Sequence, residues 1–492
     1  MINYKSTRGS KLVKTAAQAV IKGISEDKGL YVPDSFPVLP FEPADMIGKP
    51  YKDIAKAVIS AFFTDYTDEE LQACVDGAYD EKFDAADIVP VIKAGGAYFL
   101  ELYHGKTSAF KDMALSILPY LLTTAVKKEK EDKKIAILTA TSGDTGKAAL
   151  EGFADVKGTE IIVFFPSDGV SEVQKRQMTT QEGANTHVFA IRGNFDDAQT
   201  GVKKIFDDDE FNAMLAENGV KLSSANSINI GRLVPQVAYY VYSYIKLLED
   251  GALKPGEKMN VVVPTGNFGN ILAAYYAMKM GIPVNKFICA SNKNNVLTDF
   301  LNTGTYDINR EFYCTNSPSM DILISSNLER LLYHLSGNDG EMVTELMEKL
   351  ASEKCYTVND TIREGLSCFA AGFADEDETK AAIGQLYKDC GYLIDTHTAV
   401  AYKVYKDYKA ATGDETPAVI ASTASAYKFA ASVSDALGMP SEADGFAYVR
   451  ALNEKTGVPI PAGLKDLDKK EIRHKDIIDR TQLAEAVKKS LI

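Results

Sequence analysis

The sequence predicts an α/β fold of two parallel-sheet domains, preceded by a mainly helical N-terminal elaboration. From residue 134 onward, short β-branched runs alternate with small-residue or polar turns and with stretches of helical period. This alternation is typical of parallel sheets that carry helices on both faces. The length of 492 residues exceeds what one hydrophobic core usually serves, which favours two or three domains.

The composition is that of a globular protein. Apolar residues make up 46% and charged residues 25%, which is too apolar for a disordered chain. The formal net charge of −14 argues against a general nucleic-acid-binding surface, because such a surface needs an excess of Lys and Arg. An anionic ligand would therefore need a local basic pocket.

The cysteines and the N-terminus indicate the compartment. The six cysteines are scattered without a CxxC pair, unlike a disulfide framework or a zinc site. The N-terminus has no apolar leader segment, and no run approaches the ~20 apolar residues that span a bilayer. We therefore expect a cytoplasmic protein with reduced thiols, no metal, and no nucleic-acid or membrane partner.

The N-terminal elaboration is predicted over residues 1–92, where helical patterns and acidic turns at 65–70 and 80–87 replace the strand rhythm. We expect it to pack on the α/β body. A second helical and acidic segment lies near 337–378, and its charge runs are expected to be solvated faces.

A smaller α/β domain is predicted over residues 93–220. It begins with a strand at 135–138, which leads through the turn 141–146 into a helix at 147–153. Two further strands are predicted, at 160–165 and 188–191.

A larger α/β domain is predicted over residues 221–492. Its first unit is a strand at 260–263, a turn at 264–270 and a helix at 271–280. The plan continues with a strand at 286–290, and then with a strand at 418–421, a turn at 422–427 and a helix at 428–437.

These strand-to-helix turns have the composition of anion sites, because small residues let backbone N–H groups approach a ligand at the positive end of a helix. The turn at 143–147 is not a nucleotide P-loop, which needs four residues between its glycines and Ser or Thr after Lys. The turn at 266–270 lacks the glycine spacing of the dinucleotide fingerprint. Taken singly, each is compatible with a tight turn that binds nothing.

Lys111 changes this interpretation. It follows Ala109 and Phe110 and opens an apolar helical stretch at 113–122. An isolated lysine is usually a surface residue, but a lysine in a partly desolvated site has a lowered pKa and can form a Schiff base. An aldehyde cofactor also needs a phosphate cup, a loop for the substrate carboxylate and a partner for its ring nitrogen. The three turns offer a candidate for each.

Lys111, 141–146, 264–270 and 422–424 resemble the cofactor lysine, substrate loop, phosphate loop and ring-nitrogen segment of fold-type II pyridoxal-phosphate enzymes, the tryptophan synthase β-like kind. Further segments resemble the longer members of the threonine synthase family, at 4–9, 27–33, 226–236, 317–327 and 395–400. The resemblance runs essentially end to end and in order. It implies a lyase that converts O-phospho-L-homoserine and water into L-threonine and phosphate, the last step of threonine biosynthesis, by β,γ-elimination and β-addition.

The resemblance also implies roles around the cofactor, pyridoxal 5′-phosphate. Lys111 would hold the cofactor and then carry protons, Thr423 would face the pyridine nitrogen, and Asp144 stands where related enzymes usually carry Asn, with its role open. The cofactor phosphate would be bound by the loop residues Gly266, Asn267, Phe268, Gly269 and Asn270.

For the substrate, the resemblance implies two groups of contacts. The α-carboxylate would be bound by Ser142, Gly143 and Thr145, and the phosphate by Asn226, Ser227 and Arg232. The planar fork of Arg232 suits a phosphate, and Pro235 is expected to mark a helix start close by. The alternative for Arg232 is a surface salt bridge, in which case Lys106 is the next candidate for the substrate phosphate.

The chain departs from the family pattern at two places. Lys106 and Ser108 replace Pro and Leu before Lys111, and residues 425–427 replace His-Pro-Ala after Ala424. Among the histidines, His104 and His397 lie in matching motifs and are expected to pack or to support the site. The other three histidines have no neighbours that suggest a metal-ligand set.

Two alternatives stay open at this point. One is another fold-type II enzyme, such as a hydroxyamino-acid dehydratase or a β-replacement synthase, which shares the loops. The other is a non-enzymatic nucleotide-binding α/β protein, since a fold does not fix a function. The sequence leaves the oligomeric state open between monomer and homodimer.

Overall fold

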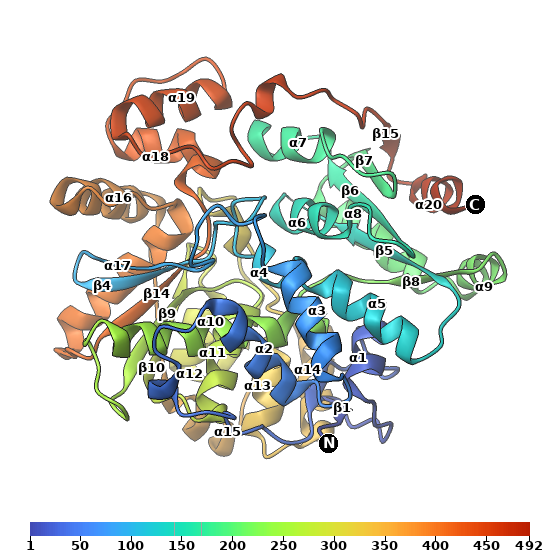
Figure 1. Ribbon diagram of the computed structural model, residues 1–492, viewed down its shortest axis with the longest axis horizontal. Coiled ribbons are helices and arrows are strands. Elements are labelled where there is room, and N and C mark those ends of the chain that lie inside the picture. The colour runs from blue at the N-terminus through green and yellow to red at the C-terminus, as the bar shows by residue number, and fades with distance from the viewer. Residues whose placement is uncertain (142, 169) are drawn as a thin grey trace.

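Two sheets organise the part of the chain that the computed structural model describes, residues 1–141, 143–168 and 170–492. One sheet has six strands in the order β13-β10-β9-β14-β4-β3, and the other has five in the order β15-β7-β6-β5-β8. The smaller sheet lies at the upper right of Figure 1 and the larger one at the lower left. The predicted α/β class with parallel sheets is confirmed.

The smaller sheet is parallel throughout. Its strands are β5 (Lys134–Ala140), β6 (Thr159–Pro166), β7 (Thr186–Arg192), β8 (Val220–Ser223) and β15 (Ile477–Asp479). The sheet is accompanied by α6 (Asp144–Phe153), α7 (Glu172–Thr179), α8 (Phe195–Phe206), α9 (Asp209–Glu217) and α20 (Leu483–Leu491). β6 is buried along nearly its whole length, as expected for a central strand covered on both faces.

The larger sheet is parallel except for the β3–β4 hairpin at its edge. Its strands are β3 (Val91–Ala94), β4 (Ala97–Glu101), β9 (Met259–Pro264), β10 (Val284–Ser291), β13 (Phe369–Phe373) and β14 (Ala418–Ser422). Its main helices are α10 (Ile230–Glu249), α11 (Gly269–Met280), α12 (Val296–Thr303), α16 (Glu376–Cys390), α17 (Thr396–Thr412), α18 (Ala430–Ala436) and α19 (Gly445–Thr456).

The N-terminal residues form a small antiparallel pair and three helices, which cover α10 and α5 (Leu118–Lys128). These elements are β1 (Tyr4–Ser6), α1 (Ala16–Lys22), β2 (Tyr31–Pro33), α2 (Tyr51–Phe62) and α3 (Asp68–Ala78). Thr15 and Thr67 each form a capping box at the start of α1 and α3, which fixes where these helices begin. α2 lies against α10 (Figure 1).

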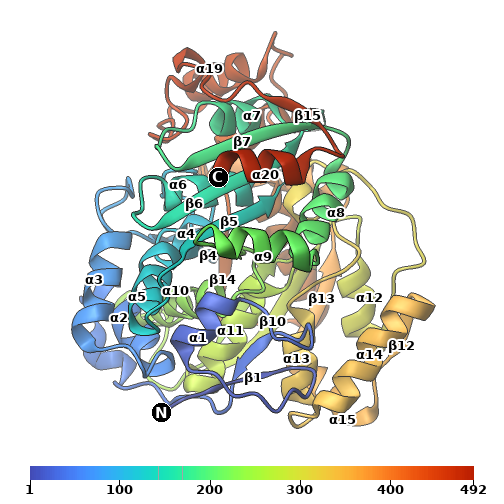
Figure 2. The same ribbon diagram turned by 90° about the vertical axis from the view of Figure 1, so that its right-hand side faces the viewer.

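The C-terminal residues return to the smaller sheet. After α19 the chain crosses to β7, where β15 adds a parallel edge strand, and α20 then packs on α8 (Figure 2). Arg176 holds this crossing by donating hydrogen bonds to the carbonyl groups of Leu467, Asp468 and Lys470. The predicted domain boundaries near residues 92 and 220 stay predictions. Two strands do not follow them: β4, from the predicted smaller domain, pairs with β14 of the larger sheet, and β15, from the predicted larger domain, pairs with β7 of the smaller sheet.

The strands predicted at 135–138, 160–165, 188–191, 260–263, 286–290 and 418–421 are all present. The helix expected over 113–122 is divided into α4 (Asp112–Leu115) and α5, because Pro119 occupies the first turn of α5. Pro235 does not mark a helix start. It lies inside α10, which begins at Ile230 because the Asn229 side chain caps the helix by accepting from Gly231 N–H.

The segment near 337–378 is only partly helical. It contains α14 (Gly340–Glu353) and α15 (Asp360–Gly365), but also β12 (Cys355–Thr357), which pairs with β11 (Thr305–Asp307), and the edge strand β13. Among the described helices, none combines the length and apolar character that a membrane crossing requires.

Candidate active site

The predicted turns lie at the carboxyl ends of parallel strands, where ligands bind in open α/β sheets. The turn at 141–146 follows β5, the turn at 264–270 follows β9, and the turn at 422–427 follows β14. Lys111 lies between β4 and α4, next to the last of these turns. Residues from both sheets therefore meet at one site.

Lys111 is held in place by its backbone. Phe110 N–H donates to the carbonyl of Thr423 at 2.8 Å, Ser425 N–H donates to the carbonyl of Ser108 at 3.1 Å, and Ala109 forms a β-bridge with Ala424. Thr423, which is 6% exposed, therefore lies beside the lysine. The position of the lysine depends on this bridge and not on contacts of its own side chain.

The Lys111 amine is largely enclosed, with 12% of the side chain exposed. Its Nζ lies 3.6 Å from Asp144 Oδ2 and 5.0 Å from the centre of the Phe110 ring. Burial lowers the pKa of Lys111, Asp144 opposes that change, and the positive charges of Lys428 and Arg232 lower the pKa further. An amine with a lowered pKa loses its proton more readily and becomes a nucleophile.

Asp144 is the first residue of α6 and is 5% exposed. Its Oδ1 lies 2.6 Å from Lys428 Nζ and accepts from Gln174 Nε2 at 2.9 Å, while its Oδ2 accepts from Ser319 Oγ at 3.4 Å. Burial alone would raise the pKa of Asp144, but the positive charges of Lys428 and Lys111 hold it far below its ordinary range. Asp144 is therefore ionised.

The predicted phosphate loop joins β9 to α11. Phe268 has a φ of 63°, in the left-handed region, and it directly precedes the first residue of the helix. The carbonyl of Gly266 accepts from Ser325 Oγ at 2.7 Å, and the carbonyl of Asn267 accepts from Asn327 N–H and Nδ2 at 3.1 and 2.9 Å. The first N–H groups of a helix have no intrahelical acceptor, so this end of α11 suits an anion.

Asn270, in the first turn of α11, is buried at 8% exposure. Its Oδ1 accepts from the Tyr240 hydroxyl, which fixes the orientation of the amide. Its Nδ2 is buried and has no hydrogen-bond partner within the described residues. An orphaned donor of this kind costs free energy unless a ligand accepts from it.

Arg232, in the first turn of α10, is 3% exposed. One amino group donates to the carbonyl of Ala225 at 2.8 Å, while Nε has no partner among the described residues. Burial lowers the pKa of Arg232 to about 10. The structure excludes the surface salt bridge considered for Arg232, because the side chain is buried and pairs with no carboxylate in the described part of the chain.

The remaining predicted substrate residues surround this arginine and α6. Asn226 and Ser227 are half-buried just before α10, and Thr145 is half-buried in the first turn of α6. Gly143 has a φ of 151°, which side chains rarely adopt, and a Cβ there would lie 2.5 Å from Gln174 Nε2, so another residue would strain the backbone and displace Gln174. Ser142 lies outside the described residues. Lys106 instead pairs with Glu151 at 3.0 Å and is half exposed.

Three further residues support the site and were not predicted from the sequence: Lys428, Asn327 and Arg330. Arg330 is fully buried and donates to the carbonyls of Tyr31 and Ile228 and to Asn327 Oδ1. Asn327 in turn donates to the Asn267 carbonyl and, at 3.3 Å, to Ser227 Oγ. The pair therefore ties the phosphate loop to the loop before α10 and to the N-terminal strand β2. The motif at 317–327 contained Asn327 but gave no reason to choose it.

His397 supports the site through Ser319. Its Nδ1 lies 2.7 Å from Asp395 Oδ2, and its Nε2 accepts from Ser319 N–H at 3.1 Å. Since Nε2 accepts, the proton of the ring is on Nδ1. The histidine thus fixes the backbone of the residue whose hydroxyl contacts Asp144.

His104 lies between two carboxylates, with Nδ1 2.7 Å from Asp84 Oδ1 and Nε2 2.9 Å from Glu101 Oε2. Burial alone would lower the pKa of His104, but these hydrogen bonds and charges raise it to about 9. A pKa raised above the unfolded value of ~6.5 gives stability that is fully present below pH ~6.5 and is lost as the pH rises through about 9.

We therefore expect His104→Gln to destabilise the protein more at pH 6 than at pH 9.5. The loss in the free energy of unfolding should be about 1–2 kcal/mol larger at pH 6 than at pH 9.5. This size lies between the contributions typical of exposed ion pairs and of buried hydrogen bonds to charged groups. Urea unfolding at both pH values measures it. In Asp84→Asn, the stability that protonated His104 contributes should be lost at a lower pH than in the wild type. An equal loss for His104→Gln at both pH values would show that the ring is neutral in the folded protein.

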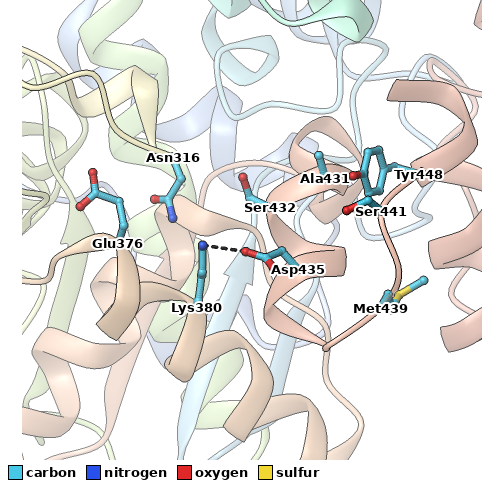
Figure 3. A pocket seen from close by; sticks show the side chains of 9 residues that line it. All are labelled: Asn316, Glu376, Lys380, Ala431, Ser432, Asp435, Met439, Ser441 and Tyr448. Carbon is cyan, nitrogen blue, oxygen red and sulfur yellow. Dashed lines mark ion pairs between the residues drawn. The ribbon is translucent and has the colours of Figure 1, made fainter. Parts of the chain in front are cut away.

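A cavity of about 360 Å³ lies away from these residues, between α16, α18 and α19 (Figure 3). Lys380 Nζ lies 2.6 Å from Asp435 Oδ2 across it. The lining residues, within the described chain, include none of the residues predicted for the site. The cavity is therefore separate from the site around Lys111.

The charges at the site call for an anion. Lys428 and Arg232 contribute two cations, Lys111 adds a third while it is protonated, and Asp144 is the one carboxylate that pairs with any of them in the described part of the chain. Within the described residues, no group of three or more His, Cys, Asp or Glu side chains could hold a metal ion. The enclosed amine, the helix start at 269 and the orphaned Asn270 Nδ2 together fit an aldehyde that carries a phosphate.

Three family profiles match the chain. "Threonine synthase N terminus" matches residues 3–79, "Pyridoxal-phosphate dependent enzyme" matches 93–423, and "Threonine synthase, C-terminal" matches 398–490. Together these profiles account for most of the sequence.

Among curated relatives, threonine synthase of Pseudomonas aeruginosa is 36% identical, over 96% of this chain and 95% of its own length. Human threonine synthase-like 1 is 42% identical over 86% of this chain, but the chain spans only 58% of the length of that relative. A solved structure of pyridoxal-phosphate-bound threonine synthase from Brucella melitensis superposes with a TM-score of 0.88 at 34% identity, covering 100% of this chain and 99% of that one. Yeast threonine synthase gives the same TM-score at 31% identity, covering 99% of this chain and 98% of that one.

Proposed function

Because the chain belongs to the threonine synthase family of pyridoxal-phosphate-dependent enzymes, we propose that it converts O-phospho-L-homoserine and water into L-threonine and phosphate. The observation that carries the proposal is the enclosed Lys111 amine in a site where two further buried cations, Lys428 and Arg232, face a single carboxylate, Asp144, among the described residues. Family membership favours this reaction over the dehydratase, the β-replacement enzyme and the nucleotide-binding protein considered above.

The cofactor is pyridoxal 5′-phosphate. When bound, it supplies an aldehyde that joins an amine and a ring that withdraws electrons from the substrate carbons. Lys111 would hold the cofactor covalently. Residues 266–270 would bind the cofactor phosphate at the start of α11, and Asn270 Nδ2 would donate a hydrogen bond to that phosphate. Thr423 would face the ring nitrogen with a hydroxyl, which does not enforce protonation as a carboxylate would.

The substrate brings a carboxylate and a phosphate, which match the excess positive charge of the site. The Nε of Arg232, left without a partner in the described structure, would bind the phosphate with Asn226 and Ser227. The turn after β5, with Gly143, Thr145 and the undescribed Ser142, would receive the carboxylate at the N-terminus of α6.

Lys111 would then move the protons. Its Nζ, once free of its own proton, takes the proton from the substrate Cα and later returns one to the same carbon. A second proton leaves Cβ as the bond between Cγ and the phosphate oxygen breaks, and Cγ later takes up a proton and becomes the methyl group. The hydroxyl of water then adds at Cβ. The phosphate held by Arg232 is the group that would accept the proton of this water.

Phosphate release from O-phospho-L-homoserine, measured together with threonine, tests the proposal. We expect equal amounts of phosphate and threonine. Phosphate accompanied by ammonia and a 2-oxo acid instead of threonine would identify an eliminating lyase. Failure of the pyridoxal-phosphate-loaded protein to release phosphate would reject the reaction altogether.

Asn327→Ala should weaken binding of pyridoxal phosphate about two- to tenfold. The substitution removes the side-chain donor to the Asn267 carbonyl, and one such hydrogen bond contributes about 0.5–1.5 kcal/mol. Titration of cofactor-free protein with pyridoxal phosphate, followed by absorbance, gives the affinity. Asn302→Ala, at an exposed position on α12, is the matched control. An unchanged affinity in Asn327→Ala would mean that the backbone alone holds the loop.

We further propose that the protein is a cytoplasmic enzyme, present as a monomer or a homodimer and without nucleic-acid or membrane partners. The six cysteines support a reducing compartment, since all are free in the described structure. Light scattering coupled to gel filtration distinguishes the two oligomeric states.

A further inference from the structure

Lys428 is a buried cation to which no role was assigned from the sequence. It lies in the short 3₁₀ turn (Ala426–Phe429) that follows β14, and its side chain is completely enclosed. Its Nζ lies 2.6 Å from Asp144 Oδ1 and donates to the carbonyl of Thr107 at 2.9 Å. An enclosed ammonium group is costly unless it is paired, so Lys428 requires the carboxylate of Asp144.

The carboxylate of Asp144 is shared unequally between two lysines. Oδ1 contacts Lys428 at 2.6 Å, whereas Oδ2 lies 3.6 Å from Lys111. Gln174 and Ser319 donate to the same carboxylate and hold its orientation. Lys428 therefore forms the close ion pair, and Lys111 stands one ångström farther away.

The other charged groups that face Lys111 determine what would happen without Lys428. Asp144 from α6, Lys428 from the turn after β14 and Arg232 from α10 act on its amine, beside the ring of Phe110. Were Lys428 uncharged, Asp144 would have Lys111 as its only ion-pairing partner within the described residues. An enclosed carboxylate stabilises the charged form of a neighbouring amine, so it would retain a proton on Lys111.

We infer that Lys428 is a positioning residue that neutralises Asp144 and thereby leaves the Lys111 amine free to lose its proton. The inference rests on the proposed function in one respect, that Lys111 is the reacting amine. A protonated Lys111 is neither a nucleophile nor a base, so the close ion pair prepares the lysine for both roles. Lys428 acts through Asp144 and needs no contact with the substrate.

The test is the titration of Lys111 itself in the cofactor-free protein of residues 1–492. Labelling with 2,4,6-trinitrobenzenesulfonate over a range of pH, with Lys111 quantified by peptide mass spectrometry, gives the midpoint of its deprotonation. Lys428→Met should raise this midpoint by about one pH unit or more, the size expected when a nearby opposite charge is no longer compensated. Lys428→Arg keeps the charge and should leave the midpoint near that of the wild type.

Asp144→Asn should lower the midpoint, and the double variant Lys428→Met/Asp144→Asn should return it close to the wild-type value. Lys380→Met removes a lysine from another close ion pair, with Asp435, and is the matched control that leaves the midpoint unchanged (Figure 3). An unchanged midpoint in Lys428→Met, or no reversal in the double variant, overturns the inference. If Lys428→Met does not fold, the Asp144→Asn variant decides. A deprotonation midpoint of Lys111 that is not lower in Asp144→Asn than in the wild type overturns the inference equally.

In the loaded enzyme, the acid limb of the kcat/KM profile should move to higher pH in Lys428→Met. A merely structural loss would lower the whole profile without moving this limb. Since the labelling requires neither substrate nor turnover, a protein that forms no threonine would refute the proposed function and leave the inference about Lys428 to be decided by the titration.

Discussion

Lys111→Ala is expected to abolish threonine formation while the fold remains intact. The substitution removes the amine that would hold the cofactor and carry the Cα proton, and either loss alone costs orders of magnitude. The backbone contacts of this segment do not involve the Lys111 side chain, since Phe110 N–H still meets the Thr423 carbonyl. Phosphate release should fall by a factor of at least about 10³.

The variant should still bind pyridoxal phosphate, noncovalently, through the loop at 266–270. Borohydride should therefore fix the cofactor to the wild type at Lys111 and leave the variant unmodified. Lys349→Ala, at an exposed position on α14, controls for the general effect of losing a lysine. More than a trace of threonine formation by Lys111→Ala would show that another amine reacts.

Arg232→Lys is expected to be far from conservative. A lysine keeps the charge but offers a point charge in place of a planar fork, so it cannot reach the Ala225 carbonyl and a phosphate as the guanidinium would. A contact to a charged group contributes about 1.5–3 kcal/mol. The value of kcat/KM should therefore fall about ten- to a hundredfold, mainly through KM.

Two observations would accompany this loss. Cofactor absorbance should stay normal, because Arg232 is assigned to the substrate phosphate, and inorganic phosphate should inhibit the variant less strongly than the wild type. Arg450→Lys, at a half-exposed position that pairs with Asp468, is the matched control. If kcat/KM and phosphate inhibition both stay at wild-type levels, the substrate phosphate binds elsewhere.

The strands that carry the site could be predicted because they are covered on both faces. Such strands appear in a sequence as short, mostly apolar runs that contain Val or Ile and lie before small-residue turns, and β5, β9 and β14 all have this form. The edge strands β13 and β15 could not be predicted in this way. Both have exposed positions, and β15 has only three residues, so neither shows the unbroken buried pattern of a central strand.

The reacting residues could be proposed because family motifs surround them, whereas the residues that support them could not. Lys428 and Arg330 belong to residue types that are rarely enclosed, so their sequence positions favour the surface. Only the fold places Lys428 against Asp144 and Arg330 against the carbonyls of Tyr31 and Ile228. These partners lie more than a hundred positions away in the chain, and no local pattern connects them.

The crossing that brings β15 to the edge of β7 also constrains the order of folding. The four strands that precede it in this sheet lie between residues 134 and 223, so about 250 residues must be synthesised before the edge is closed. Until then the backbone groups of β7 are open to pairing with other chains, which is a known route to aggregation. Loss of the last thirty or so residues, even by late proteolysis, would reopen that edge without touching any residue assigned here to the substrate.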